Sequence, residues 1–212
     1  MVGVTFIRKP ALKPVSAVAW SLTSHENETT RRILYISSMN QTYPEYWPQY
    51  FTATIYEWKH ILADDACKDI IIDSLKFMVT NKWIELNAFV IMNNHIHLIW
   101  QPMFGFNPSD IQSSFMKYTA QQLKLILEKH NNELLSLLKV NKEDRIYQVW
   151  KRRPLSIELS TDAVFGQKLD YIHYNPVKAG LCVYPEDYYY SSVAFYHDGT
   201  DNFSISTHYT GN

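Results

Sequence analysis

The sequence predicts an α+β fold with a central antiparallel sheet, and three observations lead to this prediction. Short segments rich in β-branched and aromatic residues alternate with longer segments of helical periodicity. Only Asn93 and Asn94 separate the second short segment from the third, which favours an antiparallel hairpin. The order is strand, helix, strand, strand, helix, strand, helix. This is a ferredoxin-like split βαβ arrangement, with helices on one face of the sheet and one additional C-terminal helix.

Four segments are expected to form the strands, because each suits a pleated and half-buried surface. They cover residues 50–56, 84–92, 95–100 and 155–159. The first reads Tyr-Phe-Thr-Ala-Thr-Ile-Tyr, and Val149-Trp150 leads into the last.

Three helices are expected, over residues 65–81, 108–138 and 161–175. Asp64 or Asp65 can cap the first helix, and Ser160 or Thr161 can cap the third. The third helix should end by Asn175, because Pro176 disfavours helical backbone in the residue before it. Residues 141–144 are expected to form a polar loop.

The chain divides into an extension, a main domain and a tail. Residues 1–47 contain three prolines and are expected to be an N-terminal extension that could hold a short strand at residues 33–36. Residues 48–198 carry the pattern described above, and residues 199–212 follow as a C-terminal tail.

Composition limits the function classes. The 212 residues carry a net charge of −1, so the chain is not a basic nucleic-acid-binding protein by bulk charge. Any DNA contact must come from a local patch, of which Lys151-Arg152-Arg153 is the densest, although such a triplet is more often a solvated loop. Two cysteines make no disulfide framework, which favours a reducing cytoplasm. The sequence contains no run of eighteen apolar residues, so no membrane span is predicted.

His95 and His97 are the first candidates for chemistry. One residue separates them in a predicted strand, so both imidazoles should point to the same face of the sheet. Two such nitrogens are half of a metal site on a rigid element. A His-x-His pair on a strand is, however, more often a polar pair on a solvated face.

The third helix offers the other half of such a site. Tyr171 and Asn175 are four residues apart and share a helix face, with Lys168 one turn earlier. An amide carbonyl can be a third metal ligand, and a phenolate favoured by a nearby cation can be a nucleophile. A helical tyrosine is more often a packing residue, and Asn before Pro often only ends a helix. Tyr118 and Tyr174 are competing phenols, of which Tyr118 fits the core stripe of its own helix.

Four segments together resemble the single-tyrosine HUH transposases, most closely the REP-associated tyrosine transposases of bacteria. They are residues 87–100 with His-Ile-His, residues 111–120, Val149-Trp150 with residues 154–159, and residues 169–181 with residues 185–194. The last contains Tyr-Ile-His-Tyr-Asn-Pro-Val-Lys-Ala-Gly and a late Ser-Ser. The resemblance covers residues 49–198 and marks them as an HUH transposase-like catalytic domain.

The resemblance implies a role for each matched residue. His95, His97 and Asn175 would bind Mg²⁺ or Mn²⁺, although imidazole ligands alone would not exclude zinc. Tyr171 would attack single-stranded DNA, bind its 5′ phosphate covalently and release a 3′ hydroxyl. The partner would be single-stranded or hairpin DNA, and the protein would act in the bacterial cytoplasm at the nucleoid, as a monomer or homodimer.

Six residues are candidate DNA contacts: Trp150, Lys151, Arg152, Arg153, Lys168 and Lys178. Two other functions stay open from the sequence. One is a domesticated module that binds single-stranded nucleic acid without catalysis. The other is a metal-dependent phosphodiesterase that uses water in place of Tyr171.

Overall fold

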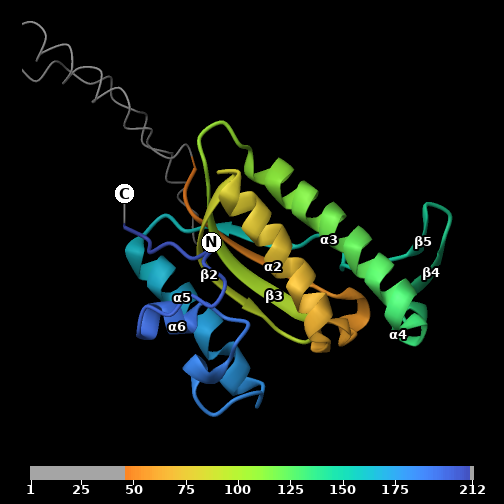
Figure 1. The fold of residues 1–212 in the computed structure, drawn as a ribbon. Coiled ribbons are helices and arrows are strands. Elements are labelled where there is room, and N and C mark those ends of the chain that lie inside the picture. The colour runs from red at the N-terminus through yellow and green to blue at the C-terminus, as the bar shows by residue number, and fades with distance from the viewer. Residues whose placement is uncertain (1–45, 211–212) are drawn as a thin grey trace, which may run out of the picture. The chain divides into compact units, whose positions relative to one another are not determined.

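A four-stranded antiparallel sheet forms the centre of the residues that this computed structural model describes, 46–210 (Figure 1). Its strands are β1 (Gln49–Thr54), β2 (Ile84–Ile91), β3 (His95–Pro102) and β6 (Leu155–Glu158). They lie in the order β2-β3-β1-β6, and each strand is antiparallel to its neighbours. The α+β prediction and the ferredoxin-like order are therefore confirmed. The strand expected at residues 33–36 lies outside the described residues.

Two long helices cover one face of the sheet. They are α2 (Asp65–Thr80), whose first turn is capped by the Asp64 side chain, and α3 (Pro108–His130). Their apolar sides pack on every second residue of the strands, such as Phe51 of β1 and Trp100 of β3, which are fully buried. This layer holds most of the buried apolar side chains, so it supplies most of the hydrophobic stabilisation.

The helix α5 (Asp162–Lys178) covers the opposite face, as Figure 1 shows. The Thr161 side chain caps its first turn, as predicted. A smaller apolar cluster docks it on the sheet through Phe165 and Ile172, which pack with residues such as Val90 and Ile99. Alternate residues of β1 and β3 point to this face of the sheet, so their side chains lie beneath α5.

The helix α5 continues three residues beyond the predicted end, through Pro176 to Lys178. Two features allow this. The Pro176 ring is buried against the domain, and the carbonyls of the last turn are satisfied. The Asn175 carbonyl accepts from Ala179, and the Pro176 carbonyl accepts from Leu181 after Gly180 turns the chain at φ +69°.

The second predicted helix ends earlier than expected. It stops at His130, because Asn131 has non-helical backbone and its side chain caps a separate short helix, α4 (Asn132–Ser136), by accepting from the Leu134 amide. Of the loop expected at residues 141–144, only 143–144 form a turn; residues 141–142 belong to β4 (Lys139–Lys142), which forms a hairpin with β5 (Arg145–Tyr147).

The C-terminal segment runs along β2. It contains a 3₁₀ turn (Pro185–Asp187) and the short helix α6 (Val193–His197). The Ser192 amide donates to the Phe89 carbonyl, and the Thr207 amide donates to Leu86. Part of the segment expected as a tail therefore pairs with the sheet. Among the described residues, no helix combines the length and apolarity needed to cross a membrane.

Candidate active site

The strand β3 presents His95 and His97 on the face covered by α5. Their ring centroids are 4.8 Å apart. In the antiparallel register Thr52 of β1 lies opposite His97, and Thr54 lies opposite His95. The prediction that both imidazoles share one face of a strand is confirmed.

His97 is the more deeply buried of the two, with 4% of its surface exposed. Its Nδ1 lies 2.9 Å from the Tyr50 hydroxyl and 2.7 Å from the Thr52 hydroxyl. Its Nε2 is buried and has no hydrogen-bond partner in the described part of the chain. A hydroxyl oxygen can accept the Nδ1 proton, and in that tautomer Nε2 presents a free lone pair.

Burial, with smaller contributions from the neighbouring His95 and Lys168, lowers the pKa of His97 to about 3. The ring is therefore neutral at physiological pH. A neutral imidazole with an unpaired nitrogen is the form that binds a divalent metal, because no proton has to be displaced.

His95 is held by its neighbour Asn94. The Asn94 amide donates to the Trp58 carbonyl at 3.3 Å, which turns its oxygen toward His95 Nδ1 at 2.7 Å. An amide oxygen can only accept, so Nδ1 carries the proton in the neutral ring and Nε2 is the nitrogen with the lone pair. Burial lowers the pKa of His95, and a side-chain hydrogen bond with Asn175 opposes this shift.

Asn175 and Tyr171 come from α5, one turn apart. The Asn175 amide nitrogen donates to the Tyr171 carbonyl at 2.8 Å, which leaves the amide oxygen directed away from the helix backbone. The Tyr171 ring lies 5.3 Å from the His97 ring and 6.4 Å from the Tyr50 ring, both edge-on. Tyr171 is 40% exposed, so its hydroxyl is accessible to a substrate. One chain therefore brings all four predicted residues together.

Two lysines of α5 lie beside the phenol. The Lys168 ammonium is 5.9 Å from the centre of the Tyr171 ring and 4.8 Å from that of Tyr50. The Lys178 ammonium is 5.3 Å from the centre of the Tyr171 ring. Cations at this distance favour the binding of a negatively charged phosphate.

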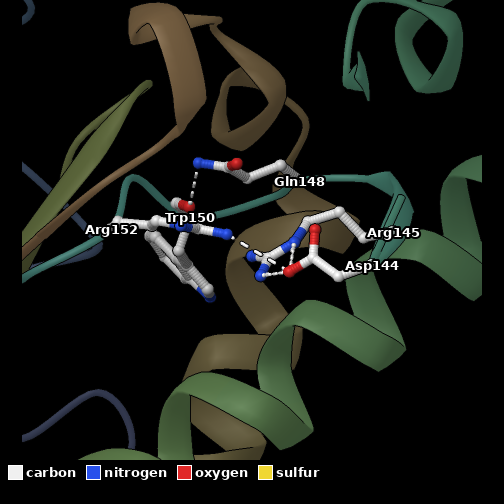
Figure 2. Close-up of polar contacts among 5 residues, drawn as sticks. All are labelled: Asp144, Arg145, Gln148, Trp150 and Arg152. Atoms are coloured by element: carbon white, nitrogen blue, oxygen red, sulfur yellow. Dashed lines mark hydrogen bonds and ion pairs between the residues drawn. The ribbon is translucent and has the colours of Figure 1, made fainter. Parts of the chain in front are cut away.

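The basic triplet begins at the same end of the sheet as His95. The Lys151 amide donates to the Thr54 carbonyl at 2.7 Å, and Thr54 pairs with His95. The three basic side chains are exposed. Arg152 forms an ion pair of 3.2 Å with Asp144, which also binds Arg145 (Figure 2). The triplet is thus partly ordered by the β4–β5 hairpin.

Trp150 does not offer a surface to DNA, in contrast to the sequence prediction. Its side chain is 6% exposed, and its indole N–H donates to the Thr119 hydroxyl of α3 at 3.0 Å. The reason is the antiparallel bridge between Trp150 and Ile55, which turns the indole into the core.

Of the competing phenols, Tyr118 is on α3 and Tyr174 is on α5. The prediction that Tyr118 belongs to the core stripe of its helix is wrong: it is half exposed, because the neighbouring Thr119 takes the buried position. Tyr174 is exposed. In the described residues no three His, Cys, Asp or Glu side chains gather as a metal-binding group. A third ligand beside the two histidines would therefore be the Asn175 amide.

The sequence prediction missed Tyr50, Thr52 and Asn94, which orient the histidines. The alternation along β1 could have indicated Thr52 once the register with β3 was known. It also missed the role of His173. His173 Nε2 lies 3.1 Å from the Ser192 hydroxyl, which also receives a bond from the Phe89 amide. The late Ser-Ser motif thereby ties α5 to β2.

The chain is similar in fold to solved structures of other proteins. It is similar to the structure of a REP-associated tyrosine transposase bound to a REP hairpin, with a TM-score of 0.53 and 19% identity over 80% of this chain and 98% of that one. It is also similar to a protein of Deinococcus radiodurans R1 assigned as a transposase, with a TM-score of 0.40 and 16% identity over 60% of this chain and 89% of that one. No family model and no curated protein matches. The chain thus has the fold of the REP-associated tyrosine transposase.

Proposed function

We propose that this chain is a single-tyrosine HUH transposase that cleaves and rejoins single-stranded DNA through a 5′-phosphotyrosine. The observation that carries the proposal is the convergence of His95, His97 and Asn175 beside the accessible Tyr171. The fold shared with a REP-associated tyrosine transposase supports the same function.

A divalent cation, Mg²⁺ or Mn²⁺, is proposed as the cofactor. Its ligands would be His95, His97 and Asn175. The unpaired and buried Nε2 of His97 fits this role, because a buried polar atom without a partner is costly unless a ligand satisfies it. When bound, the cation would polarise a phosphate oxygen as a Lewis acid.

Tyr171 is the proposed nucleophile. Its hydroxyl oxygen forms a bond to the scissile phosphorus, the phenol proton passes to solvent, and the bond from phosphorus to the 3′ oxygen breaks. That oxygen takes up a proton and leaves as a 3′ hydroxyl. Attack by a 3′ hydroxyl on the phosphotyrosine reverses these changes and rejoins DNA. Lys168 and Lys178 stabilise negative charge on the phenolate and phosphate during both steps.

The proposed substrate is DNA with a hairpin and single-stranded flanks. The similar solved transposase was bound to a REP hairpin, which supports this choice. The exposed side chains of Lys151, Arg152 and Arg153, together with Lys168 and Lys178, are the proposed phosphate contacts. Since one chain carries both the histidines and Tyr171, the site is proposed to act in cis, in a monomer or in each chain of a homodimer.

The Tyr171→Phe variant tests the proposal. The ring stays in place while the nucleophilic oxygen is lost, so covalent DNA–protein adducts should fall by a factor of about 10³ or more. Adducts are measured on denaturing gels with labelled hairpin DNA and Mn²⁺. Tyr174→Phe is the matched control, because it removes an exposed hydroxyl from the same helix, and it should keep adduct formation.

Three outcomes would contradict the proposal. Adduct formation by Tyr171→Phe would mean that another residue is the nucleophile. Cleavage by Tyr171→Phe with free 5′ phosphates and no adduct would instead indicate a phosphodiesterase that uses water. Binding of hairpin DNA without any metal-dependent cleavage by the natural protein would indicate a binding module.

A further inference from the structure

Trp58 is an exposed aromatic residue that the proposed reaction does not use. It ends the 3₁₀ turn Tyr56–Trp58, and 55% of its surface is exposed. Glu57 and Trp58 have φ angles of 52° and 57°, so two consecutive residues with side chains adopt left-handed backbone. Such conformations are uncommon outside glycine and tend to cluster at functional sites.

The contacts of Trp58 tie it to the histidine strand. Its amide donates to the Ile55 carbonyl at 2.9 Å, and its carbonyl accepts from Asn94 at 3.3 Å. Its ring lies edge-on to His95, with 6.0 Å between the ring centroids. Because more than half of its surface is exposed, much of the indole remains free for another ring.

The basic triplet lies next to the segment that carries Trp58. The Tyr56 amide donates to the Val149 carbonyl at 2.8 Å, and the Lys151 amide donates to Thr54. An exposed indole therefore lies beside the candidate metal ligand His95 and on a segment that is bonded to the strand leading into the three exposed cations. Single-stranded nucleic acids bind where aromatic side chains stack on bases beside a positively charged path for the phosphates.

We propose that Trp58 is a stacking platform for an unpaired base next to the scissile phosphate. The proposal rests on the proposed function and identifies a substrate contact of the same site. Because Trp58 contacts His95, the base that it stacks belongs to a nucleotide close to the phosphate bound there. Stacking is tolerant of sequence, since every base has a flat face, so this contact positions the strand without reading it.

The test combines a protein change with a DNA change. The Tyr171→Phe protein, which cannot form the adduct, is titrated with a fluorescent DNA hairpin that carries unpaired oligo-dT flanks. Abasic sites are placed one at a time along the flanks. One abasic position should weaken binding on the order of tenfold. Adding Trp58→Ala should weaken binding of the intact DNA by a similar factor and remove the sensitivity to that position.

Two variants serve as controls. Trp58→Tyr keeps a flat ring and should retain most of the affinity. Phe77→Ala removes an aromatic side chain of equal exposure, 55%, from α2 on the opposite face of the sheet, and it should leave affinity and abasic sensitivity unchanged. Thermal unfolding of each variant establishes that its fold is kept.

The effects of Trp58→Ala and of each abasic site on binding affinity could be additive while the natural protein still forms the Tyr171 adduct. That result would overturn the stacking proposal and leave the proposed function standing. Unchanged affinity of the Trp58→Ala variant for intact DNA would overturn it as well. No binding of the flanked hairpin, together with no adduct, would overturn the stacking proposal and the proposed function together.

Discussion

The two faces of the central sheet differ in chemistry although the same strands form both. On the face covered by α2 and α3, Phe51 stacks on Trp100 at 4.9 Å and meets Phe115 edge-on at 6.1 Å. On the face covered by α5, Tyr50 and Thr52 bind the His97 ring. Neighbouring residues of β1 thus serve the core and the candidate site. One face stabilises the fold, and the other positions reactive groups.

This difference shows why register matters in this protein. A slip of one residue in the pairing of β1 with β3 would bring Phe51 and Ala53 to the histidines and remove both hydroxyls. The apolar face disfavours such a slip, because it would turn either Phe51 or Trp100 away from the core in which both are buried. The core therefore determines the geometry of the site on the opposite face.

The largest expected effect is a difference in the free energy of unfolding between variants of two adjacent residues of β1. Phe51→Ala should lower the free energy of unfolding by about 3–5 kcal/mol, because it leaves a cavity in the core. Tyr50→Phe removes one hydroxyl from His97 and should cost only about 0.5–1.5 kcal/mol. Urea unfolding followed by circular dichroism measures both. Equal losses would contradict the division of roles between the two faces.

The second prediction concerns pH and His173, which ties α5 to β2. Burial lowers the pKa of His173 from its ordinary value of 6.5 to about 4. Between these values the unfolded chain binds more protons than the folded chain, so lowering the pH from 6.5 toward 4 destabilises the fold. At pH 5, this effect of His173 lowers the free energy of unfolding by an amount on the order of 1–2 kcal/mol.

His173→Gln should therefore flatten the pH dependence of stability in that window, because glutamine does not titrate and can still bond to Ser192. Unfolding in urea at several pH values between 4 and 7 measures this. An unchanged dependence on pH would show that His173 is not buried in its neutral form.

A smaller and more local effect is expected at Thr52. Thr52→Val keeps the shape of the side chain and removes the hydroxyl 2.7 Å from His97 Nδ1. Residues that orient metal-binding histidines typically contribute 10–100-fold to metal affinity, so binding of Mn²⁺ should weaken by about that factor. Isothermal titration calorimetry measures it. Thr54→Val is the control on the same face, opposite His95, and should bind Mn²⁺ as the natural protein does. Equal affinity of both variants would show that the Thr52 hydroxyl does not orient the site.

The sequence predicts those parts of the fold that depend on local chemistry. Asp64 and Thr161 cap their helices as expected, and alternation places His95 and His97 on one face. The errors lie where packing overrides local preference. The helix α5 passes through Pro176 because its ring is buried, and Trp150 is buried because its backbone pairs with β1.

Less of the candidate site than of the fold could be predicted from the sequence. Spacing placed Tyr171 and Asn175 on one helix face, but only the resemblance to a family connected that helix with the histidine strand. Thr52 follows only from the register of β1 with β3, and Trp58 follows only from exposure and backbone geometry. These features depend on contacts between residues far apart in the sequence, so no local pattern indicates them.

We propose that His95, His97 and Asn175 converge on one cation beside Tyr171. Anomalous diffraction from crystals soaked in Mn²⁺ tests it most directly. We expect one strong peak at about 2.0–2.3 Å from His97 Nε2, with His95 and the Asn175 oxygen as further ligands, and no such peak for His97→Ala. A Mn²⁺ peak that lies away from these residues, or none at saturating Mn²⁺, would contradict the account.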